Sequence, residues 1–231
     1  MAFGSRLINT NSGGGGISYV GSDFTTSGSG RATSLNVPIP ATRSTGDLMV
    51  VFMTTSYGTY SQSNAGSGFT FVYQNGSGSN EVFYGLYYKI SDGTEPATIN
   101  FTAPANEHLN AHCIVLRGTA TSNPINVGTD VIISSGFTGT HNGFSGNDTD
   151  ANLFFALQRD YTVTSYNITP SSDFDIQNFV KNGGTLSTSS NCFLALRNQD
   201  TVTSAAQAVG WGVNTGGTSR TIANQFRILS A

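Results

Sequence analysis

Three histidines are the residues in this sequence whose chemistry best suits metal binding or proton transfer near neutral pH. His108 and His112 stand four residues apart, Glu107 precedes the first of them, and His141 follows later in the chain. A strand beginning at Ala111 would separate His108 from His112 along an extended backbone, and their order with Glu107 does not form a zinc-protease motif. We therefore expect histidines at loops or strand ends on the surface, with a metal pair as the less favoured alternative.

Two pairs of aspartates could also carry chemistry. Asp148 and Asp150 alternate as calcium ligands do, but the stretch lacks the glutamate that completes a calcium loop. It matches the turn before Leu48, so we expect it to open a strand, with a weak calcium site as the alternative. Asp173 and Asp175 would share one face of a strand, where a solvated role is expected and a pair of carboxylates for glycoside hydrolysis is the alternative.

Tyrosines could bind sugars, because the ring stacks on the apolar face of a sugar while the hydroxyl makes polar contacts. Most tyrosines of this chain lie in predicted strands, where core packing is expected. Tyr57 and Tyr60 lie instead in a predicted loop. They are the candidate glycan-stacking residues.

The remaining motifs argue against an enzyme. Cys113 and Cys192 lie in apolar runs, which favours buried, unpaired thiols over a disulfide framework or a zinc cluster. No serine stands in a nucleophile-elbow pattern, neither lysine follows a glycine as in a phosphate-binding loop, and no G-x-G-x-x-G occurs. We expect no catalytic residues, no cofactor and no metal.

The composition indicates a folded β-protein. In 231 residues, hydrophobic residues reach 37% and aromatic residues 11%, while charged residues are only 10% and glycines number 28. The net charge of -3 and the scattered arginines exclude a basic nucleic-acid groove. No apolar stretch is long enough for a secretory signal or a membrane span, so we expect assembly in a cytoplasm and no membrane partner.

Short apolar runs separated by Gly, Pro, Asn, Asp and Ser predict β-strands joined by turns. The predicted strands are Ile17–Val20, Thr33–Val37, Asp47–Thr54, Phe69–Tyr73, Val82–Ile90, Ala97–Thr102, Ala111–Arg117, Asn152–Gln158, Phe174–Val180, Cys192–Arg197, Ala208–Val213 and Thr221–Leu229. The strand around Phe83–Lys89 is apolar on both faces, which predicts a central strand covered on both sides. Thr98–Thr102 alternates, which places Ile99 and Phe101 toward a core.

A weak internal repeat runs through the same strands. Five apolar blocks recur in one order with slowly growing separation, as a duplication followed by loop insertions would produce. The matched residues are Leu48 with Leu153, Phe69 with Phe174, Lys89 with Arg197, Phe101 with Trp211, and Ala111 with Ala223.

We expect a single antiparallel β-sandwich over residues 17–231, jelly-roll-like and internally duplicated, with repeat halves at about 17–118 and 150–231. The segment between the halves has no Pro-rich or charged linker, which favours one compact body. Residues 1–16 read as a flexible or docking arm. Its possible docking residues are Asn11, Gly13, Gly14, Gly15 and Gly16.

Several motifs of the chain resemble a β-sandwich family common among virion proteins of tailed bacteriophages and some bacterial surface proteins. The resemblance spans about residues 17–229, and Phe69 stands where a tryptophan is common in that family. The motifs that carry it are Thr-Gly-Asp-Leu-Met-Val-Val (45–51), Gly-Ser-Gly-Phe-Thr (66–70), Leu-Tyr-Tyr-Lys-Ile (86–90), Glu-Pro-Ala-Thr-Ile-Asn-Phe-Thr (95–102), Ile-Val-Leu-Arg-Gly (114–118) and Asn-Pro-Ile-Asn (123–126).

This resemblance implies a non-enzymatic structural protein on the exterior of a virus particle. The expected role is a capsid decoration protein that binds the major capsid protein or other virion subunits and forms a homo-oligomer. The alternative is a tail or head appendage, or a carbohydrate-binding module, that recognises a host surface glycan. A surface of Gly, Ser, Thr and Asn fits repeated protein contacts, because these short side chains lose little conformational entropy when they are buried.

Overall fold

The computed structural model describes residues 16–28, 30–76, 82–133, 138–141, 149–158, 166–169, 176–181, 191–197, 209–213 and 221–231. Within these ranges the chain forms sixteen β-strands and one turn of 3-10 helix, η1 (Gln62–Asn64). No helix in the described ranges has the length and apolar character needed to span a membrane.

The first half of the chain builds two antiparallel sheets. The larger has the strand order β1-β7-β3-β5-β4, and β2 pairs with β6 in a separate two-stranded sheet. The strands of the larger sheet are β1 (Ser18–Thr26), β3 (Leu48–Thr55), β4 (Thr70–Gly76), β5 (Phe83–Ile90) and β7 (Leu109–Arg117). The smaller sheet contains β2 (Ala32–Pro38) and β6 (Thr98–Glu107).

The second half builds a six-stranded and a three-stranded antiparallel sheet. The six-stranded sheet has the order β13-β14-β11-β16-β8, and β9 pairs with the other end of β16. Its strands are β8 (Ile125–Val127), β9 (Val131–Ile133), β11 (Ala151–Gln158), β13 (Ile176–Lys181), β14 (Asn191–Arg197) and β16 (Thr221–Ile228). The smaller sheet, of order β10-β15-β12, contains β10 (Thr138–His141), β12 (Tyr166–Thr169) and β15 (Val209–Val213).

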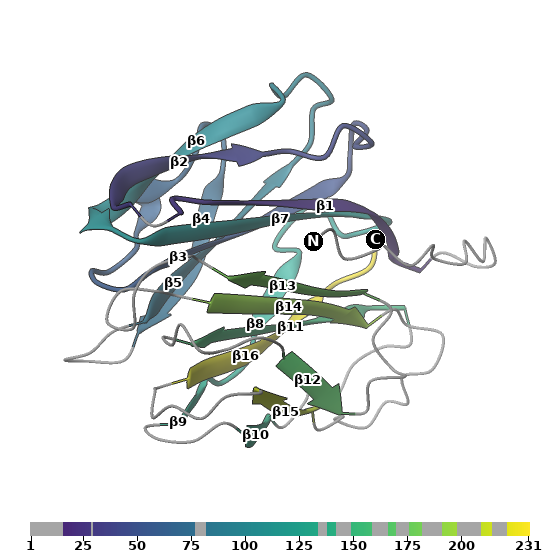
Figure 1. Cartoon of the computed structure of the whole chain (residues 1–231). Helices are drawn as coiled ribbons and strands as arrows, with labels where there is room; N and C mark the ends of the chain where they lie inside the picture. Colours follow the sequence, from purple (N-terminus) through teal and green to yellow (C-terminus); the bar gives the residue numbers. More distant parts are fainter. Residues whose placement is uncertain are drawn as a thin grey trace.

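The four sheets lie in four layers (Figure 1). The two large sheets pack face to face in the middle, and the two small sheets lie outside them, β2 and β6 at the top of the view and β10, β12 and β15 at the bottom. One apolar core lies between the two large sheets and contains residues from both halves of the chain. A second core lies between the first large sheet and the β2–β6 pair.

Strand β3 shows why the layers stack in this way. All eight of its residues are buried. Leu48, Val50 and Phe52 face the core between the large sheets, while the alternate residues Met49 and Val51 face the core under β2 and β6. A strand with an apolar residue at every position cannot leave either face in water, so it requires a layer on each side.

The structure confirms the all-β prediction and the sandwich-like packing of antiparallel sheets. The strand that was predicted to be central is β5; it lies inside the sheet, between the central strand β3 and the edge strand β4, and its residues Tyr84–Tyr87 are buried. Ile99 and Phe101 of β6 lie in a core, as the alternating pattern predicted. Each predicted strand corresponds to a strand of the structure. The structure also contains β8, β9, β10 and β12, which the sequence did not predict as strands. These four strands are only three or four residues long, which is too short for a periodic pattern to be recognised.

The two large sheets have corresponding topologies. When the order of the second is written β8-β16-β11-β14-β13, its strands appear in the same sequence order as in β1-β7-β3-β5-β4. The pairing of β2 with β6 likewise has a counterpart in β10 with β15. This agreement favours the predicted repeat, while duplication as its origin and the jelly-roll description stay predictions.

The packing between the large sheets suggests which residues of β3 and β11 are equivalent in the two halves. The rings of Phe52 in β3 and Phe155 in β11 stack with their centroids 4.4 Å apart and their planes 9° apart. Equivalent residues meet each other in this way when they lie near a two-fold axis. If Phe52 is equivalent to Phe155, the alignment of the two halves is shifted by two residues from the one that matches Leu48 with Leu153.

Candidate functional site

The candidate glycan residue Tyr57 lies on the surface, in the loop that follows β3, and its side chain is 66% exposed. The backbone of this loop is fixed by Thr55, whose hydroxyl donates to the Tyr57 carbonyl at 3.1 Å and accepts from the Tyr57 N–H at 3.3 Å. Gly58, with φ of 95°, packs so closely against β6 that a Cβ there would lie 2.8 Å from Cγ of Pro104. The ring of Tyr57 is thus presented to solvent by an ordered turn.

Tyr60 does not accompany Tyr57, and its assignment to a glycan-stacking surface is corrected by the structure. The side chain of Tyr60 is 1% exposed and lies in the core under β2 and β6, edge-on to the ring of Tyr87. Gly85 of β5 makes this possible, because a Cβ there would lie 2.6 Å from Cβ of Tyr60. A loop position predicted exposure, but the missing side chain of Gly85 creates the space that Tyr60 fills.

The two described histidine side chains are buried, which corrects the prediction of surface histidines. His108 lies between β6 and β7, and His112 lies within β7 and is 2% exposed. Burial lowers the pKa of His112 to about 3, so this imidazole is neutral at physiological pH. His141 belongs to β10, and its side chain lies outside the described features. No group of three or more His, Cys, Asp or Glu side chains in the described ranges could hold a metal ion.

Asp150 lies in the turn directly before β11, and its side chain holds this turn to neighbouring residues, as a strand-opening role predicts. Its carboxylate accepts from the guanidinium of Arg227 and, at 2.9 Å, from the N–H of Ser230. Asp47 does the same before β3, where Arg117 donates two hydrogen bonds of 2.8 Å to its two carboxylate oxygens. A buried aspartate therefore directly precedes each of the central strands β3 and β11, and it is bound by an arginine of the neighbouring strand. Asp148, the other half of the candidate calcium pair, lies outside the described residues.

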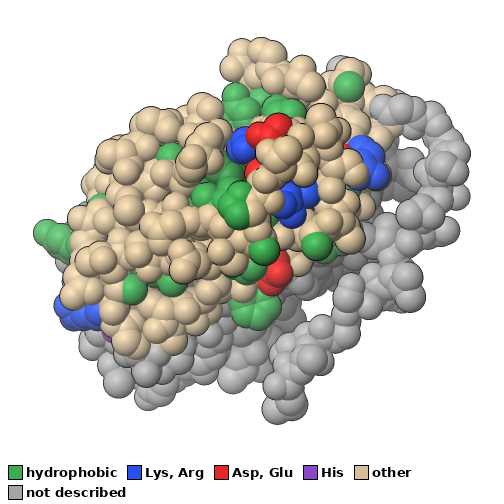
Figure 2. Space-filling view, turned by 90° about the horizontal axis from the view of Figure 1, so that it is seen from above, with side chains coloured by type: hydrophobic (Ala, Val, Ile, Leu, Met, Phe, Trp, Pro, Cys, Tyr) green, Lys and Arg blue, Asp and Glu red, His purple; other side chains and the backbone are tan. Residues whose placement is uncertain are grey.

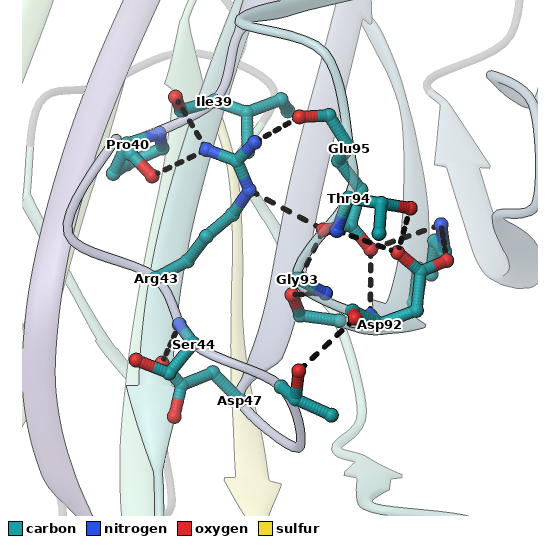
Figure 3. A network of polar contacts seen from close by, with 12 residues as sticks. Ile39, Pro40, Arg43, Ser44, Asp47, Asp92, Gly93, Thr94 and Glu95 are labelled. Atoms are coloured by element: carbon teal, nitrogen blue, oxygen red, sulfur yellow. Dashed lines mark hydrogen bonds and ion pairs between the residues drawn. The ribbon is translucent and has the colours of Figure 1, made fainter.

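A second polar network joins the loops β2–β3 and β5–β6 (Figure 3). The guanidinium of Arg43 reaches across to the side chain of Glu95 at 3.3 Å and to its backbone carbonyl, and it also donates to the carbonyl of Pro40 at 2.9 Å. Glu95 in turn accepts from Ser91 at 2.8 Å and from Lys89 at 2.9 Å. Burial opposes ionisation of Glu95, but these donors and the N–H of Asp92 outweigh it and lower its pKa to about 2.

A third network lies between the halves of the chain and was missed by the sequence analysis. The carboxylate of Asp130, in the loop between β8 and β9, accepts from the hydroxyls of Tyr73 at 2.7 Å and Tyr84 at 2.6 Å. It also accepts from the side-chain amides of Asn75 and, at 2.9 Å, Asn224. The first three partners come from β4 and β5 and the last from β16, so Asp130 ties the two large sheets together.

The electrostatics of the Asp130 network follow from its burial and charge. Burial, followed by the contact with the Asp130 carboxylate, raises the pKa of Tyr73 to about 12 and that of Tyr84 well above its ordinary value. Both phenols therefore stay protonated and act as donors at physiological pH. No local motif could have revealed this network, because its members are brought together only by the packing of the two sheets.

Of the other candidate residues, the two cysteines are buried, and most of the rest lie outside the residues that the structure describes. Cys113 and Cys192 are unpaired and buried, as predicted, and burial raises the pKa of both thiols. Asp173 and Asp175 lie outside the described residues. The candidate docking residues Asn11, Gly13, Gly14 and Gly15 also lie outside them, whereas Gly16 is exposed, with its carbonyl packed against Gly118 at the end of β7.

The surface itself is poor in charge. Figure 2 shows one face on which charged side chains are few and gathered in small groups, while most of the surface is backbone or uncharged polar side chains. The outward-facing residues of the β2–β6 pair fit this description, and there Asn100 donates to Asn36 across the two strands at 3.0 Å. The large hydrophobic side chains that are exposed in the described ranges are Phe24, Tyr57 and Ile132.

Comparison with known proteins gives no match to a family model, to a curated protein or to a solved structure. The function of this chain must therefore be argued from its own residues.

Proposed function

We propose that this protein is a non-enzymatic structural component of a tailed-bacteriophage particle, placed on the exterior of the head as a capsid decoration protein. The class of protein in this proposal comes from the resemblance of the sequence motifs to virion proteins of tailed bacteriophages. In this proposal the partners are the major capsid protein or other virion subunits, and further copies of the chain itself.

The observation that carries the proposal is that the buried carboxylates hold the fold together. Asp47, Glu95, Asp130 and Asp150 all accept several hydrogen bonds or ion pairs that join separate strands and loops. Carboxylates held in this way stabilise a fold and are poorly placed to exchange protons with a substrate. The remaining surface, which is poor in charge and rich in short polar side chains, suits contacts with other protein surfaces.

Quantitative mass spectrometry of purified particles tests this proposal. A decoration protein should be present at a copy number of the same order as the major capsid protein. A copy number far below that of the capsid subunit would favour a tail or vertex appendage, and absence from particles would refute the virion assignment.

The docking role of residues 1–16 can be tested in the same particles. If the arm carries attachment, a chain lacking residues 1–15 should keep its melting behaviour but no longer bind particles that have been stripped of the protein. Gly16 is kept in this variant because its carbonyl packs against Gly118. Unchanged binding of the shortened chain would contradict the arm hypothesis and leave the decoration role to another surface.

An appendage that binds host glycan is the second candidate, and one observation favours it. Tyr57 exposes a large aromatic ring on an ordered turn, whereas most tyrosines with described side chains are buried or partly buried. Amphipathic rings held in this way are suited to stack on sugars.

A further inference from the structure

We propose that the exposed end of the first half holds a binding site for a neutral saccharide, formed by Tyr57 together with the ion pair of Arg31 and Glu107. This inference rests on the second candidate function and specifies its ligand and its residues. Tyr60, the partner expected from the sequence, is replaced in this site by two charged side chains from other elements.

The residues on both sides of Tyr57 anchor it to the C-terminal end of β6. Ser56 donates from its hydroxyl to Oε2 of Glu107 at 2.9 Å, and Gly58 packs on Pro104 three residues earlier in the same strand. The other carboxylate oxygen of Glu107 lies 3.4 Å from Nη1 of Arg31, in the turn before β2. Tyr57, Arg31 and Glu107 are therefore brought to one end of the sheet by contacts that the fold already makes.

The chemistry of these three side chains matches a sugar. An exposed tyrosine ring offers an apolar face for the C–H groups of a pyranose. Arg31, whose side chain is 53% exposed, offers several N–H donors, and Glu107, at 15%, offers acceptor oxygens, so that adjacent hydroxyls can both be bound. Because the positive and negative charges cancel, the site favours an uncharged saccharide over an anionic one.

The site is also largely formed before a ligand arrives. Hydrogen bonds from Thr55 hold the backbone of Tyr57, and the contact of Gly58 with Pro104 fixes the direction in which the loop leaves β3. A ligand therefore need not order the loop, which lowers the entropic cost of binding. Sugar contacts of this size give weak single-site affinity, which repeated copies on a particle would increase through multivalency.

Saturation-transfer NMR with the full chain tests this site. The probes are cellobiose, maltose, lactose and N,N′-diacetylchitobiose, with sialyllactose as the anionic comparison. We expect transfer to the C–H protons of at least one neutral disaccharide. Tyr57→Ala should weaken its binding by about tenfold or more, and Arg31→Ala should weaken it to a smaller extent, whereas Tyr57→Phe should retain it.

The matched control is Ile132→Ala, which removes an exposed hydrophobic side chain from β9 in the other half and should leave binding unchanged. Thermal melting of each variant establishes that the fold is intact. Absence of transfer to every neutral sugar, preference for sialyllactose, or unchanged binding by Tyr57→Ala would each overturn the proposal. These outcomes are distinct from failure of the virion assignment, which depends on copy number in particles and not on sugar binding.

Discussion

Individual buried polar atoms in this protein differ in whether the fold provides a partner for them. The hydroxyl of Tyr87 donates to the carbonyl of Ser61 at 3.1 Å, while the hydroxyl of Tyr60, which is packed against Tyr87, has no hydrogen-bond partner among the described residues. Leaving a buried hydroxyl without a hydrogen bond costs roughly 1–3 kcal/mol. The two tyrosines lie in the same core and differ in whether the hydroxyl is hydrogen-bonded, so each serves as a control for the other.

Replacing Tyr60 by phenylalanine should therefore stabilise the protein. We expect Tyr60→Phe to raise the free energy of unfolding by about 1 kcal/mol, because the ring packing is kept and the unsatisfied hydroxyl is lost. Tyr87→Phe, the control, should lower it by about 1 kcal/mol because a hydrogen bond is removed. Urea unfolding monitored by circular dichroism measures both changes. A loss of stability in Tyr60→Phe would mean that the hydroxyl has a partner, such as a buried water.

His112 predicts a pH dependence of stability. Its pKa in the folded state is lowered to about 3, whereas an exposed histidine in the unfolded chain has a pKa of about 6.5. The unfolded state therefore binds the proton first, so stability is complete above pH 6.5 and falls as the pH drops toward 3.

In urea titrations at a series of pH values, the wild type should lose about 3 kcal/mol between pH 6.5 and pH 4 through this residue. His112→Leu should show a shallower decline over the same range. The two proteins would show equal slopes if His112 were protonated within the fold, and that result would refute the buried neutral assignment.

At the scale of strands, the sequence was informative where the pattern is local. The apolar run of β5 predicted a strand covered on both faces, and the alternation in β6 predicted which residues face a core. Partners distant in sequence could not be predicted. Tyr60 was expected on the surface because its loop was recognised but the space above Gly85 was not, and Asp130 received no role because its four donors lie on three other strands.

Gly85 shows how a single missing side chain determines the packing of two elements. A Cβ at this position of β5 would lie 2.6 Å from Cβ and 2.7 Å from Cγ of Tyr60. We expect Gly85→Ala to destabilise the protein by about 2 kcal/mol, since the Tyr60 loop must move away from the sheet. Gly30→Ala is the control, because its Cβ would meet nothing closer than 3.7 Å, and its effect should stay within about 0.5 kcal/mol. Thermal unfolding compares the two, and equal effects would contradict the role of Gly85.

At the scale of the whole molecule, the two halves share the apolar core that lies between the two large sheets. Side chains from β3, β5 and β7 interleave with side chains from β11, β14 and β16 between the large sheets, and the Asp130 network bridges the same sheets. Each half alone would expose the apolar face that the other covers. The halves are therefore expected to unfold as one cooperative unit, although their strand orders correspond as two separate repeats would.

The stacked rings of Phe52 and Phe155 allow this coupling to be measured. Phe52→Ala and Phe155→Ala should each cost about 3–5 kcal/mol, because each leaves a cavity in the shared core. In the double variant the costs should fall short of their sum by about 1 kcal/mol, since the ring contact is lost only once.

Each variant should still unfold in a single transition that coincides by circular dichroism and by fluorescence of Trp211 in β15, in the outermost layer of the second half. Additive costs together with two separate transitions would mean that the halves are independent domains. A single transition with a coupling energy would instead show that the chain behaves as an intramolecular dimer, in which each half supplies the missing face of the other.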